Sequence, residues 1–425
     1  MPNRTRLLLF YTFVFLFLAT GTTILLYSYG WRIDLETGKV QKIGAIYIKG
    51  NVKDLTIKIN NKIYPDDSGL LKSGTLVSNL LPKTYKVEIS KQGYLPYHKT
   101  VTVQPSRVEE LLNVQLIPDT FQPNDLAMIK GSKFIDATDA SDQIILQDTT
   151  TGTYYLYDKA RASSTINLNL AVSNVRRTQK IKRIMFVPFK PTQFVIEDAT
   201  GFKLFDSEKN TIEQLLKGTF MTWTMKDSLI LAAETTKTHT QQIFAFNLIF
   251  RTKTQLDDIN KQLPATTFVS TLDTTGNTNT IAFEDVENNL YISTSKDKTV
   301  RRIAENVKLF TFSPDGKKLA YLSNTGDLSI LFIEEFNGDI RKKEGDVIRV
   351  ELPKKELIER VQWYDDSYHL FVKYPGYLSL TELDDRKPLN IFPILEKFDD
   401  YRYDPSERSV IYTTEGSLKT IRIEK

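Results

Sequence analysis

Four acidic pairs are the residues of this chain best suited to acid–base chemistry: Asp257-Asp258, Asp365-Asp366, Asp384-Asp385 and Asp399-Asp400. Two carboxyl groups about 5–10 Å apart can hydrolyse a glycosidic bond, one as the acid and the other as base or nucleophile. Each pair falls in a predicted inter-strand loop, where solvated turn residues are the ordinary explanation. We therefore expect no catalytic residue, and glycoside chemistry by such paired carboxylates stays open as an alternative.

A basic cluster is the second feature with chemical potential. Five cations lie within eight residues: Arg176, Arg177, Lys180, Lys182 and Arg183. Lysine and arginine commonly solvate a loop or protect the edge of a sheet, which explains such a cluster without any ligand. The functional alternative is docking on anionic material, such as lipid headgroups or an anionic wall polymer. We take these five residues as candidates for that docking.

Residue types and motifs exclude several other chemistries. The chain has no cysteine, so disulfides, thiolate catalysis and cysteine-based zinc sites are excluded. Its three histidines, His98, His239 and His369, lie far apart and are expected to pack or to face solvent. The sequence lacks a Gly-x-Ser-x-Gly elbow, a Walker-type loop, a dinucleotide glycine signature and an EF-hand loop. No metal or cofactor is expected.

Composition favours a folded β protein. The 425 residues are 41% hydrophobic and 25% charged, which is ordinary for globular domains. Phe (24) and Tyr (20) are plentiful, and aromatic side chains favour strands over helices. A formal charge of +4 over this length does not indicate a nucleic-acid partner, since such proteins concentrate their basic surface.

An apolar segment near the N-terminus predicts a membrane anchor. Residues 7–29 carry no charged side chain, and a helix of that length extends roughly 34 Å, enough to cross a bilayer. Tyr27, Tyr29 and Trp31 at its end suit the membrane–water boundary. Ala19-Thr20-Gly21 could instead be a signal-peptide cleavage site. We expect an uncleaved single-pass anchor, residues 1–6 in the cytoplasm and the remainder outside the cell.

After a linker at 30–43, residues 44–118 predict a small β-sandwich. Tyr85-Lys86-Val87-Glu88-Ile89 alternates apolar and polar residues, as a half-buried strand does. The stretch resembles the PEGA domain through Leu81-Pro82, the Tyr85–Ser90 strand, Lys91-Gln92-Gly93-Tyr94 and Val101-Thr102-Val103. Where that family has its name-giving tetrapeptide, this chain reads Lys42-Ile43-Gly44-Ala45. The resemblance implies an envelope protein and transfers no binding residue.

A strand–turn–strand phrase repeats through residues 119–425. Its period of about 44 residues is typical of four-stranded propeller blades. We expect a β-propeller of seven blades, with eight, six or a pair of stacked sandwiches as alternatives. The last repeat has no room for an outer strand, so residues 126–130 or 111–116 are expected to close the ring. The repeat centres are Ile145, Val195, Ile230, Ile281, Ala320, Phe371 and Ile411, and the hairpin turn residues are Gly152, Gly201, Asn289, Gly326, Gly376 and Gly416.

One repeat resembles the TolB-type propeller unit. Phe312-Ser313-Pro314-Asp315-Gly316 precedes the strand residues Leu319-Ala320-Tyr321, and Asp404-Pro405-Ser406 opens a looser second copy. Asp315 and Gly316 are predicted to form a turn and not a ligand site.

These features together predict an all-β, membrane-anchored envelope protein that is not an enzyme. The propeller is expected to bind a protein or a cell-wall polysaccharide through its loops, because loops on a rigid scaffold are where binding usually resides. The alternatives are a glycan hydrolase or lyase and a structural subunit of a surface assembly. The sequence does not fix the ligand or the oligomeric state.

Overall fold

The computed structural model describes residues 3–69, 72–129, 133–138, 142–159, 165–175, 180–236, 238–276 and 279–424. The chain divides into two compact units. Unit 1 contains Met1–Asp119, Asn337–Arg341 and Asp384–Asn390, and unit 2 contains the remainder. The sequence predicts the propeller over residues 119–425 without interruption, but the structure groups these two short later segments with unit 1.

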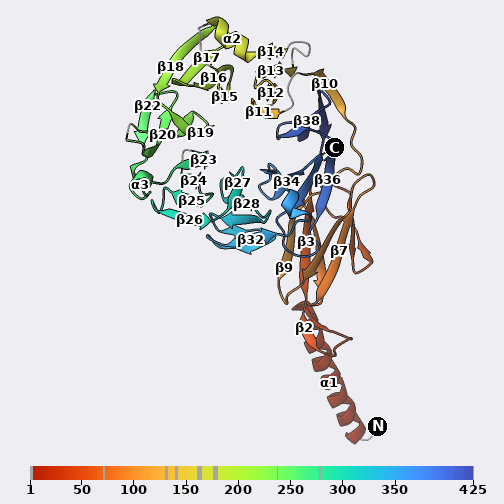
Figure 1. Ribbon diagram of the computed structural model, residues 1–425. Helices are drawn as coiled ribbons and strands as arrows, with labels where there is room; N and C mark the ends of the chain where they lie inside the picture. The colour runs from red at the N-terminus through yellow and green to blue at the C-terminus, as the bar shows by residue number, and fades with distance from the viewer. Residues whose placement is uncertain are drawn as a thin grey trace. The chain divides into compact units, whose positions relative to one another are not determined.

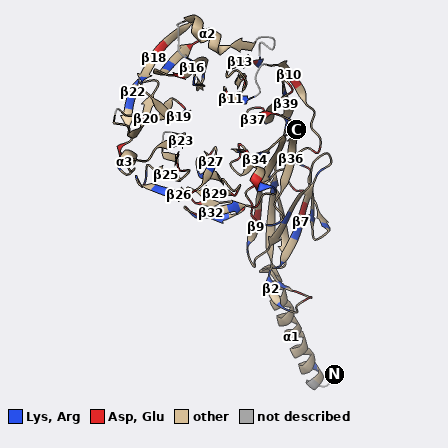
Figure 2. Ribbon diagram, in the orientation of Figure 1, with Lys and Arg blue, Asp and Glu red and all other residues tan. Residues whose placement is uncertain are grey.

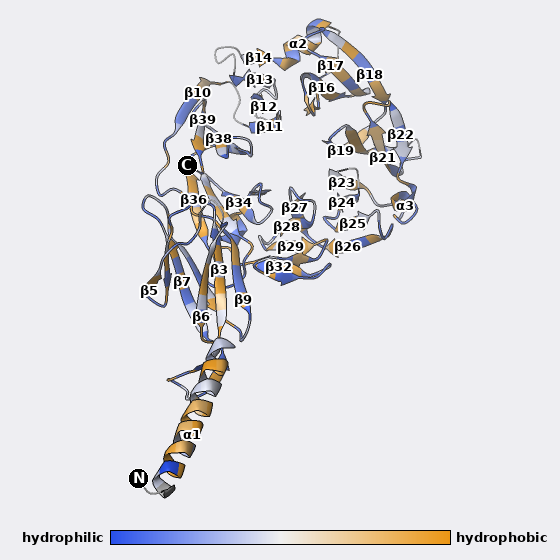
Figure 3. Cartoon of the chain, turned by 180° about the vertical axis from the view of Figure 1, so that it is seen from behind, coloured by the Kyte–Doolittle hydropathy of each residue, from blue (hydrophilic) through white to orange (hydrophobic). Residues whose placement is uncertain are grey.

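Helix α1 (Asn3–Ser28) opens the chain. Its stretch Thr5–Ser28 is long and apolar enough to span a membrane, as a signal sequence near an N-terminus also would be. None of that stretch is buried inside the protein, and Figure 3 shows the helix hydrophobic along most of its length. At its end the guanidinium of Arg32 lies 3.4 Å from the ring centre of Tyr27 and donates to the carbonyl of Tyr27 over 2.7 Å.

Two sheets supply the core of unit 1. Burial alternates along their strands, with Ile57, Ile59, Val87 and Ile89 each at most 2% exposed. Strand β9 runs parallel to β3, and the other pairings are antiparallel. A hairpin of β1 (Trp31–Ile33) and β2 (Val40–Lys42) occupies the predicted linker. The sheets are β6-β3-β9 (Thr75–Leu80, Gly44–Gly50, Val108–Val114) and β5-β4-β7-β8 (Lys62–Tyr64, Thr56–Ile59, Thr84–Ser90, Tyr97–Thr102).

A buried lysine binds the later segments of unit 1. Lys99 is 1% exposed, and its ammonium donates to the carbonyls of Asp384, Arg386 and Pro388 over 2.9–3.2 Å. The Asp384 carboxylate is fully buried and forms an ion pair with Arg386. A buried charge is costly unless it is paired and hydrogen-bonded, and these contacts satisfy the lysine.

Unit 2 contains seven four-stranded antiparallel sheets in the part of the chain that the structure describes, arranged in a ring in Figure 1. This is the architecture of a β-propeller. We number the sheets in chain order. They are sheet 1, β11–β14 (Lys133–Ala137, Gln143–Gln147, Tyr154–Asp158, Thr165–Asn167); sheet 2, β15–β18 (Arg183–Val187, Lys190–Asp198, Gly201–Asp206, Thr211–Lys217); sheet 3, β19–β22 (Phe220–Lys226, Leu229–Thr235, Gln241–Asn247, Thr252–Gln255); sheet 4, β23–β26 (Val269–Thr274, Thr280–Asp285, Leu290–Thr294, Val300–Ala304); sheet 5, β27, β28, β29 and β32 (Val307–Phe312, Lys318–Ser323, Leu328–Phe332, Val347–Val350); sheet 6, β33–β36 (Arg360–Trp363, His369–Tyr374, Tyr377–Glu382, Ile391–Glu396); and sheet 7, β37–β39 (Asp400–Asp404, Ser409–Thr414, Ser417–Arg422) with β10.

Short elements complete this unit. They are α2 (Leu168–Val175), α3 (Asp257–Asn260) and a 3-10 turn at Lys355–Leu357. The small pair β30 (Phe336–Asn337) and β31 (Arg341–Lys342) lies at the two ends of the unit 1 segment Asn337–Arg341.

Sheet 7 draws its fourth strand from the start of the repeat region. Strand β10 (Asn124–Met128) pairs antiparallel with β39, so the strand predicted near residue 126 fills the vacant place. The alternative at 111–116 is wrong, because Leu111 and Val114 lie on β9 and pair with β3 in unit 1. Closure of this kind covers a sheet edge that could otherwise recruit another chain.

All seven predicted repeat centres fall on the second strand of a sheet, where burial is nearly complete. Ile230, Phe283 and Phe371 are each 0% exposed, whereas charged residues concentrate on outer strands such as β22 and β26 (Figure 2). Neighbouring sheets pack through apolar side chains. Phe202 of sheet 2 and Phe220 of sheet 3 stack with ring centres 4.0 Å apart.

The residues predicted to form the hairpin turns have left-handed backbone conformations, with one exception. Five of the six named glycines and asparagines have positive φ, but Asn289 does not. Asn288 takes that conformation instead at +63°, and Asn289 donates its backbone N–H to Asp285. The third repeat, for which a longer loop was predicted, connects β20 to β21 through residues 236–240.

The Pro-Asp-Gly motif forms a closed turn. The Ser313 hydroxyl and the Lys317 backbone N–H both donate to one oxygen of Asp315. The other oxygen accepts from the ammonium of Lys318 over 2.9 Å, and Gly316 has φ of +71°. Asp315 is therefore occupied by turn contacts.

Candidate functional site

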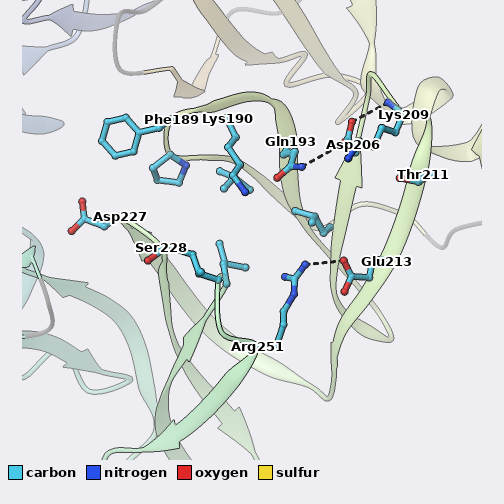
Figure 4. Close-up of a pocket in the computed structure, with 15 residues that line it drawn as sticks. Phe189, Lys190, Gln193, Asp206, Lys209, Thr211, Glu213, Asp227, Ser228 and Arg251 are labelled. Atoms are coloured by element: carbon cyan, nitrogen blue, oxygen red, sulfur yellow. Dashed lines mark hydrogen bonds and ion pairs between the residues drawn. The ribbon is translucent and has the colours of Figure 1, made fainter.

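A pocket of about 600 Å³ opens between sheets 2 and 3 (Figure 4). Val187, Leu204 and Leu248 give it an apolar interior, and Lys190, Lys209 and Arg251 are among its polar residues. Its lining comes from the β15–β16, β17–β18, β19–β20 and β21–β22 connections, which all lie at the same end of their sheets. That size lies within the range of about 300–1,000 Å³ typical of ligand pockets.

Tight turns fix the apolar tips beside this pocket. In the β15–β16 hairpin Phe189 has a φ of +60°, which is unusual for a bulky residue. In the β21–β22 turn the side-chain oxygen of Asn247 accepts the backbone N–H groups of Ile249 and Phe250 over 2.9 and 3.0 Å. An asparagine that bonds the backbone two and three residues ahead holds the following residues at the tip.

Three large apolar side chains are consequently left in solvent. Phe189 is 81% exposed, Ile249 66% and Phe250 73%. Phe189 and Ile249 line the same pocket, and Phe250 follows Ile249 directly. Scattered exposed apolar residues are normal, but a group of them at one pocket marks an interaction surface. We call Phe189, Ile249 and Phe250 the apolar rim.

The acidic residues of the pocket are largely occupied. Asp206 accepts the backbone N–H of Lys209 over 3.0 Å and the side-chain amide of Gln193 over 3.0 Å, and these donors hold the pKa of Asp206 below its ordinary value. Glu213 forms an ion pair with Arg251 at 2.8 Å. Figure 4 shows both sets of contacts and places Asp227 on the side opposite Lys209.

A second pocket, of about 700 Å³, shares the 187–190 segment and Asp227 with the first. Asp136, Met185 and Arg402, from the innermost strands of three sheets, line it. The tip of the β15–β16 hairpin therefore borders both pockets.

Carboxylates of the innermost strands bind neighbouring sheets. Asp400 accepts the backbone N–H of Phe134 over 2.9 Å, and Asp136 accepts that of Phe186 over 2.8 Å. Asp273 accepts that of Phe312 over 3.4 Å, and burial raises the pKa of Asp273. Each is an acceptor that joins one sheet to the next, a structural role that the sequence did not indicate.

The four predicted acidic pairs lie in separate places. Asp257-Asp258 begins α3 in solvent, and Asp365-Asp366 occupies the β33–β34 turn. Asp384-Asp385 belongs to unit 1, whereas Asp399-Asp400 leads into β37. The structure does not bring these pairs together within either unit.

The turn pair Asp365-Asp366 is tied into its surroundings. Asp366 accepts from Nδ1 of His369 over 2.6 Å, and Asp365 accepts the hydroxyl of Tyr403 over 3.0 Å. The hydroxyl of Tyr364 donates to Glu424 over 2.8 Å, and the Tyr364 and Tyr403 rings lie 4.8 Å apart. We call Tyr364, Asp365, Tyr403 and Glu424 the polar lock of sheets 6 and 7.

The predicted basic cluster lies away from the pockets. Arg176 and Arg177 fall outside the described residues. Lys180, Lys182 and Arg183 are exposed at the start of β15 and line neither pocket, whose residues on this strand begin at Val187 for the first pocket and at Met185 for the second. The Arg183 guanidinium lies 5.0 Å from the ring centre of Trp223. Anionic docking by these residues stays a prediction.

The histidines show no metal arrangement. His98 and His239 are exposed, and His369 is buried against Asp366. No group of three or more potential ligands among His, Cys, Asp and Glu occurs in the described part of the chain.

Sequence reasoning did not find the apolar rim. The available signal was apolar residues where turn residues are expected, as in Val187-Pro188-Phe189-Lys190 and Asn247-Leu248-Ile249-Phe250. Each run reads as the continuation of a buried strand until the hairpins are placed.

Comparison with known proteins adds little to this geometry. No family model and no curated protein matches the chain. Among solved structures it is similar to the β-propeller domain of Cps50 (Swd1) from Myceliophteria thermophila, at 9% identity and a TM-score of 0.49. That match covers 71% of this chain and 100% of the other.

Proposed function

We propose that this chain is a non-catalytic, membrane-anchored protein of the cell envelope whose seven-bladed propeller binds a protein partner. Unit 1 would be the PEGA-like spacer next to the bilayer. The TolB-like character suggested by residues 312–321 belongs to the same proposal, as does the location of units 1 and 2 outside the cell.

The observation that carries the proposal is the apolar rim at the pocket between sheets 2 and 3. Side chains of this size are 66–81% exposed, and a partner that removes them from water lowers the free energy of the complex. Burying one contributes roughly 1.5–3 kcal/mol, so three of them could anchor an interface. A propeller supports this use because its turns are held by rigid sheets.

Site-specific photo-crosslinking tests the proposal in cells. A photoreactive residue at Phe250 is expected to form a covalent adduct with a discrete partner protein. The same residue at Thr150, exposed in the β12–β13 turn at the other end of its sheet, is the matched control. If further positions on both ends of unit 2 also yield no protein adduct, the partner-binding role is wrong.

The anchor is tested separately. We expect the mature chain to retain residues 1–29 by intact-mass measurement and to resist alkaline extraction from membranes. The guanidinium of Arg32 stacks on the ring of Tyr27 at the end of α1, and such rings and cations suit the boundary of a bilayer. This contact supports an uncleaved helix α1 that remains joined to unit 1. A mature N-terminus near Gly21 would mean a cleaved signal peptide, and protection of units 1 and 2 from protease added to intact cells would overturn the outward orientation.

A further inference from the structure

We propose that the pocket between sheets 2 and 3 binds an extended partner segment in which an apolar side chain stands next to an acidic one. This inference rests on the proposed protein-binding function and specifies the partner's chemistry. It concerns only unit 2, and every pocket residue used is among those described.

The apolar half of the partner follows from the shape of the site. Leu204 and Leu248 line the interior, and Phe189 and Ile249 stand exposed at its margin. An apolar side chain placed between the two tips would cover both of them and fill the concave space beneath. A lipid surface would meet the tips but would leave the pocket under them unfilled.

The acidic half follows from which charges already have partners. Glu213 is paired with Arg251, and Asp206 is engaged by Gln193 and by backbone N–H groups. Lys190 and Lys209 are exposed, and neither ammonium makes a hydrogen bond or ion pair within the described ranges, although the Lys209 charge attracts the nearby Asp206 carboxylate. A carboxylate on the partner segment would pair with these two lysines.

Asp227 gives the segment a direction. It lies on the side of the pocket opposite Lys209 in Figure 4, on the β19–β20 turn. A carboxylate there repels an acidic residue and accepts a cation or a backbone N–H. The acidic residue of the partner should therefore lie on the sheet 2 side, and the other end of the segment on the sheet 3 side.

Peptide selection on the full chain in nanodiscs tests this specificity. The probe is a phage-displayed library of random twelve-residue peptides, and the counter-target is the double variant Phe189→Ser, Ile249→Ser. We expect peptides recovered on the parent chain to be enriched at least about tenfold over the variant, with a Phe, Leu or Ile beside Asp or Glu. Both substitutions lie at exposed positions, and thermal unfolding verifies that the variant keeps its fold.

Charge reversal then isolates the acidic contact. For a recovered peptide, Lys190→Glu with Lys209→Glu should raise Kd about tenfold or more, and the loss should shrink at high salt. Lys133→Glu with Lys217→Glu makes the same charge change at exposed positions on the ends of sheets 1 and 2 away from the pocket, and it should leave Kd within about twofold. Equal weakening by both pairs would reduce the effect to net charge and overturn the inference, as would peptides without acidic residues.

Two further outcomes separate this inference from the function on which it rests. Photo-crosslinks could form at other positions of unit 2 but not at Phe250, while the selection does not distinguish the parent chain from the variant. In that case the partner-binding role stands, and the assignment of the binding site to the pocket between sheets 2 and 3 is wrong. Brominated lipid vesicles could quench the fluorescence of the Phe250→Trp variant more than that of the parent chain. That result would show that the apolar rim contacts a membrane, and it would overturn the proposal that the pocket binds a partner segment.

Discussion

The apolar rim and the polar lock are built from the same part of a propeller and have opposite character. Each includes a turn between the first and second strands of a sheet, β15–β16 for Phe189 and β33–β34 for Tyr364 and Asp365, whereas Ile249 and Phe250 lie on the β21–β22 turn. In sheets 6 and 7 the side chains of Tyr364 and Tyr403 point their hydroxyls at carboxylates of the unit itself. At the β15–β16 turn the equivalent place holds Phe189, which is 81% exposed.

The difference separates residues that complete the fold from residues that have no internal use. A buried hydroxyl or carboxylate must find a partner, so the polar lock is a closed set of contacts. Exposed apolar tips add nothing to the stability of unit 2 and expose surface that water disfavours. Substitutions in the two regions should therefore separate stability from binding.

The largest expected effect is on the polar lock. Tyr364→Ala removes a ring that is 2% exposed and packs against Tyr403 and Phe371, and it should cost unit 2 about 3–5 kcal/mol of unfolding free energy. Hydrogen exchange of peptides from sheets 6 and 7 measures the loss. Phe250→Ala, an aromatic truncation of equal kind, should change stability by less than about 0.5 kcal/mol.

Tyr364→Phe divides the lock into packing and hydrogen bonding. It keeps the ring but removes the donor to Glu424, so a cost of about 1 kcal/mol is expected. If Phe250→Ala destabilised unit 2 as strongly as Tyr364→Ala, the distinction between the two regions would be lost.

A smaller loss of stability than for Tyr364→Ala is expected at two lysine–aspartate pairs that differ in burial. Lys318 is 1% exposed and donates to Asp315, so Asp315→Ala leaves a buried ammonium without that acceptor and should cost about 2–3 kcal/mol. Lys355 and Asp327 form a more exposed pair at 2.6 Å, and Asp327→Ala should cost much less than Asp315→Ala because solvent screens the exposed pair. Chemical denaturation monitored by hydrogen exchange measures the loss of unfolding free energy in each variant. Equal losses would show that the burial of Lys318 does not matter.

The predictable parts of this fold are those set by neighbours in sequence. Alternating apolar residues and turn signals located the second strand of each of the seven sheets of unit 2, and the missing outer strand of sheet 7 pointed to the region of β10. The error of one residue at Asn289 is of the kind expected where two asparagines adjoin, since both tolerate positive φ.

The remaining parts depend on contacts between distant residues. Phe189 and Ile249 are sixty positions apart and meet at one pocket only because two sheets are adjacent. The Lys99 contacts with residues 384–388 likewise join segments nearly three hundred positions apart. The basic cluster was found because its residues are adjacent in sequence, which says nothing of where a ligand fits.

The smallest expected effect is a pH dependence with opposite signs at two carboxylates. Burial and the charge of Asp366 raise the pKa of Asp365, so the folded state favours its protonated form. Unit 2 should lose stability as pH rises from the ordinary aspartate pKa through the raised folded value. Asp365→Asn, which cannot ionise, should therefore gain stability relative to the parent chain over that interval.

Asp327 supplies the control for that sign. Hydrogen bonds from Lys355 and Thr325 lower the pKa of Asp327, so its contribution is present above the ordinary pKa and is lost as pH falls through the lowered value. Asp327→Asn should accordingly approach the parent in stability at low pH, whereas Asp365→Asn diverges from it at higher pH. Hydrogen exchange of sheets 5 to 7 between about pH 3 and pH 7, corrected for intrinsic exchange rates, measures both differences. If the two variants followed the same pH trend, the polar lock would behave as an ordinary solvated turn, and its contrast with the apolar rim would rest on packing alone.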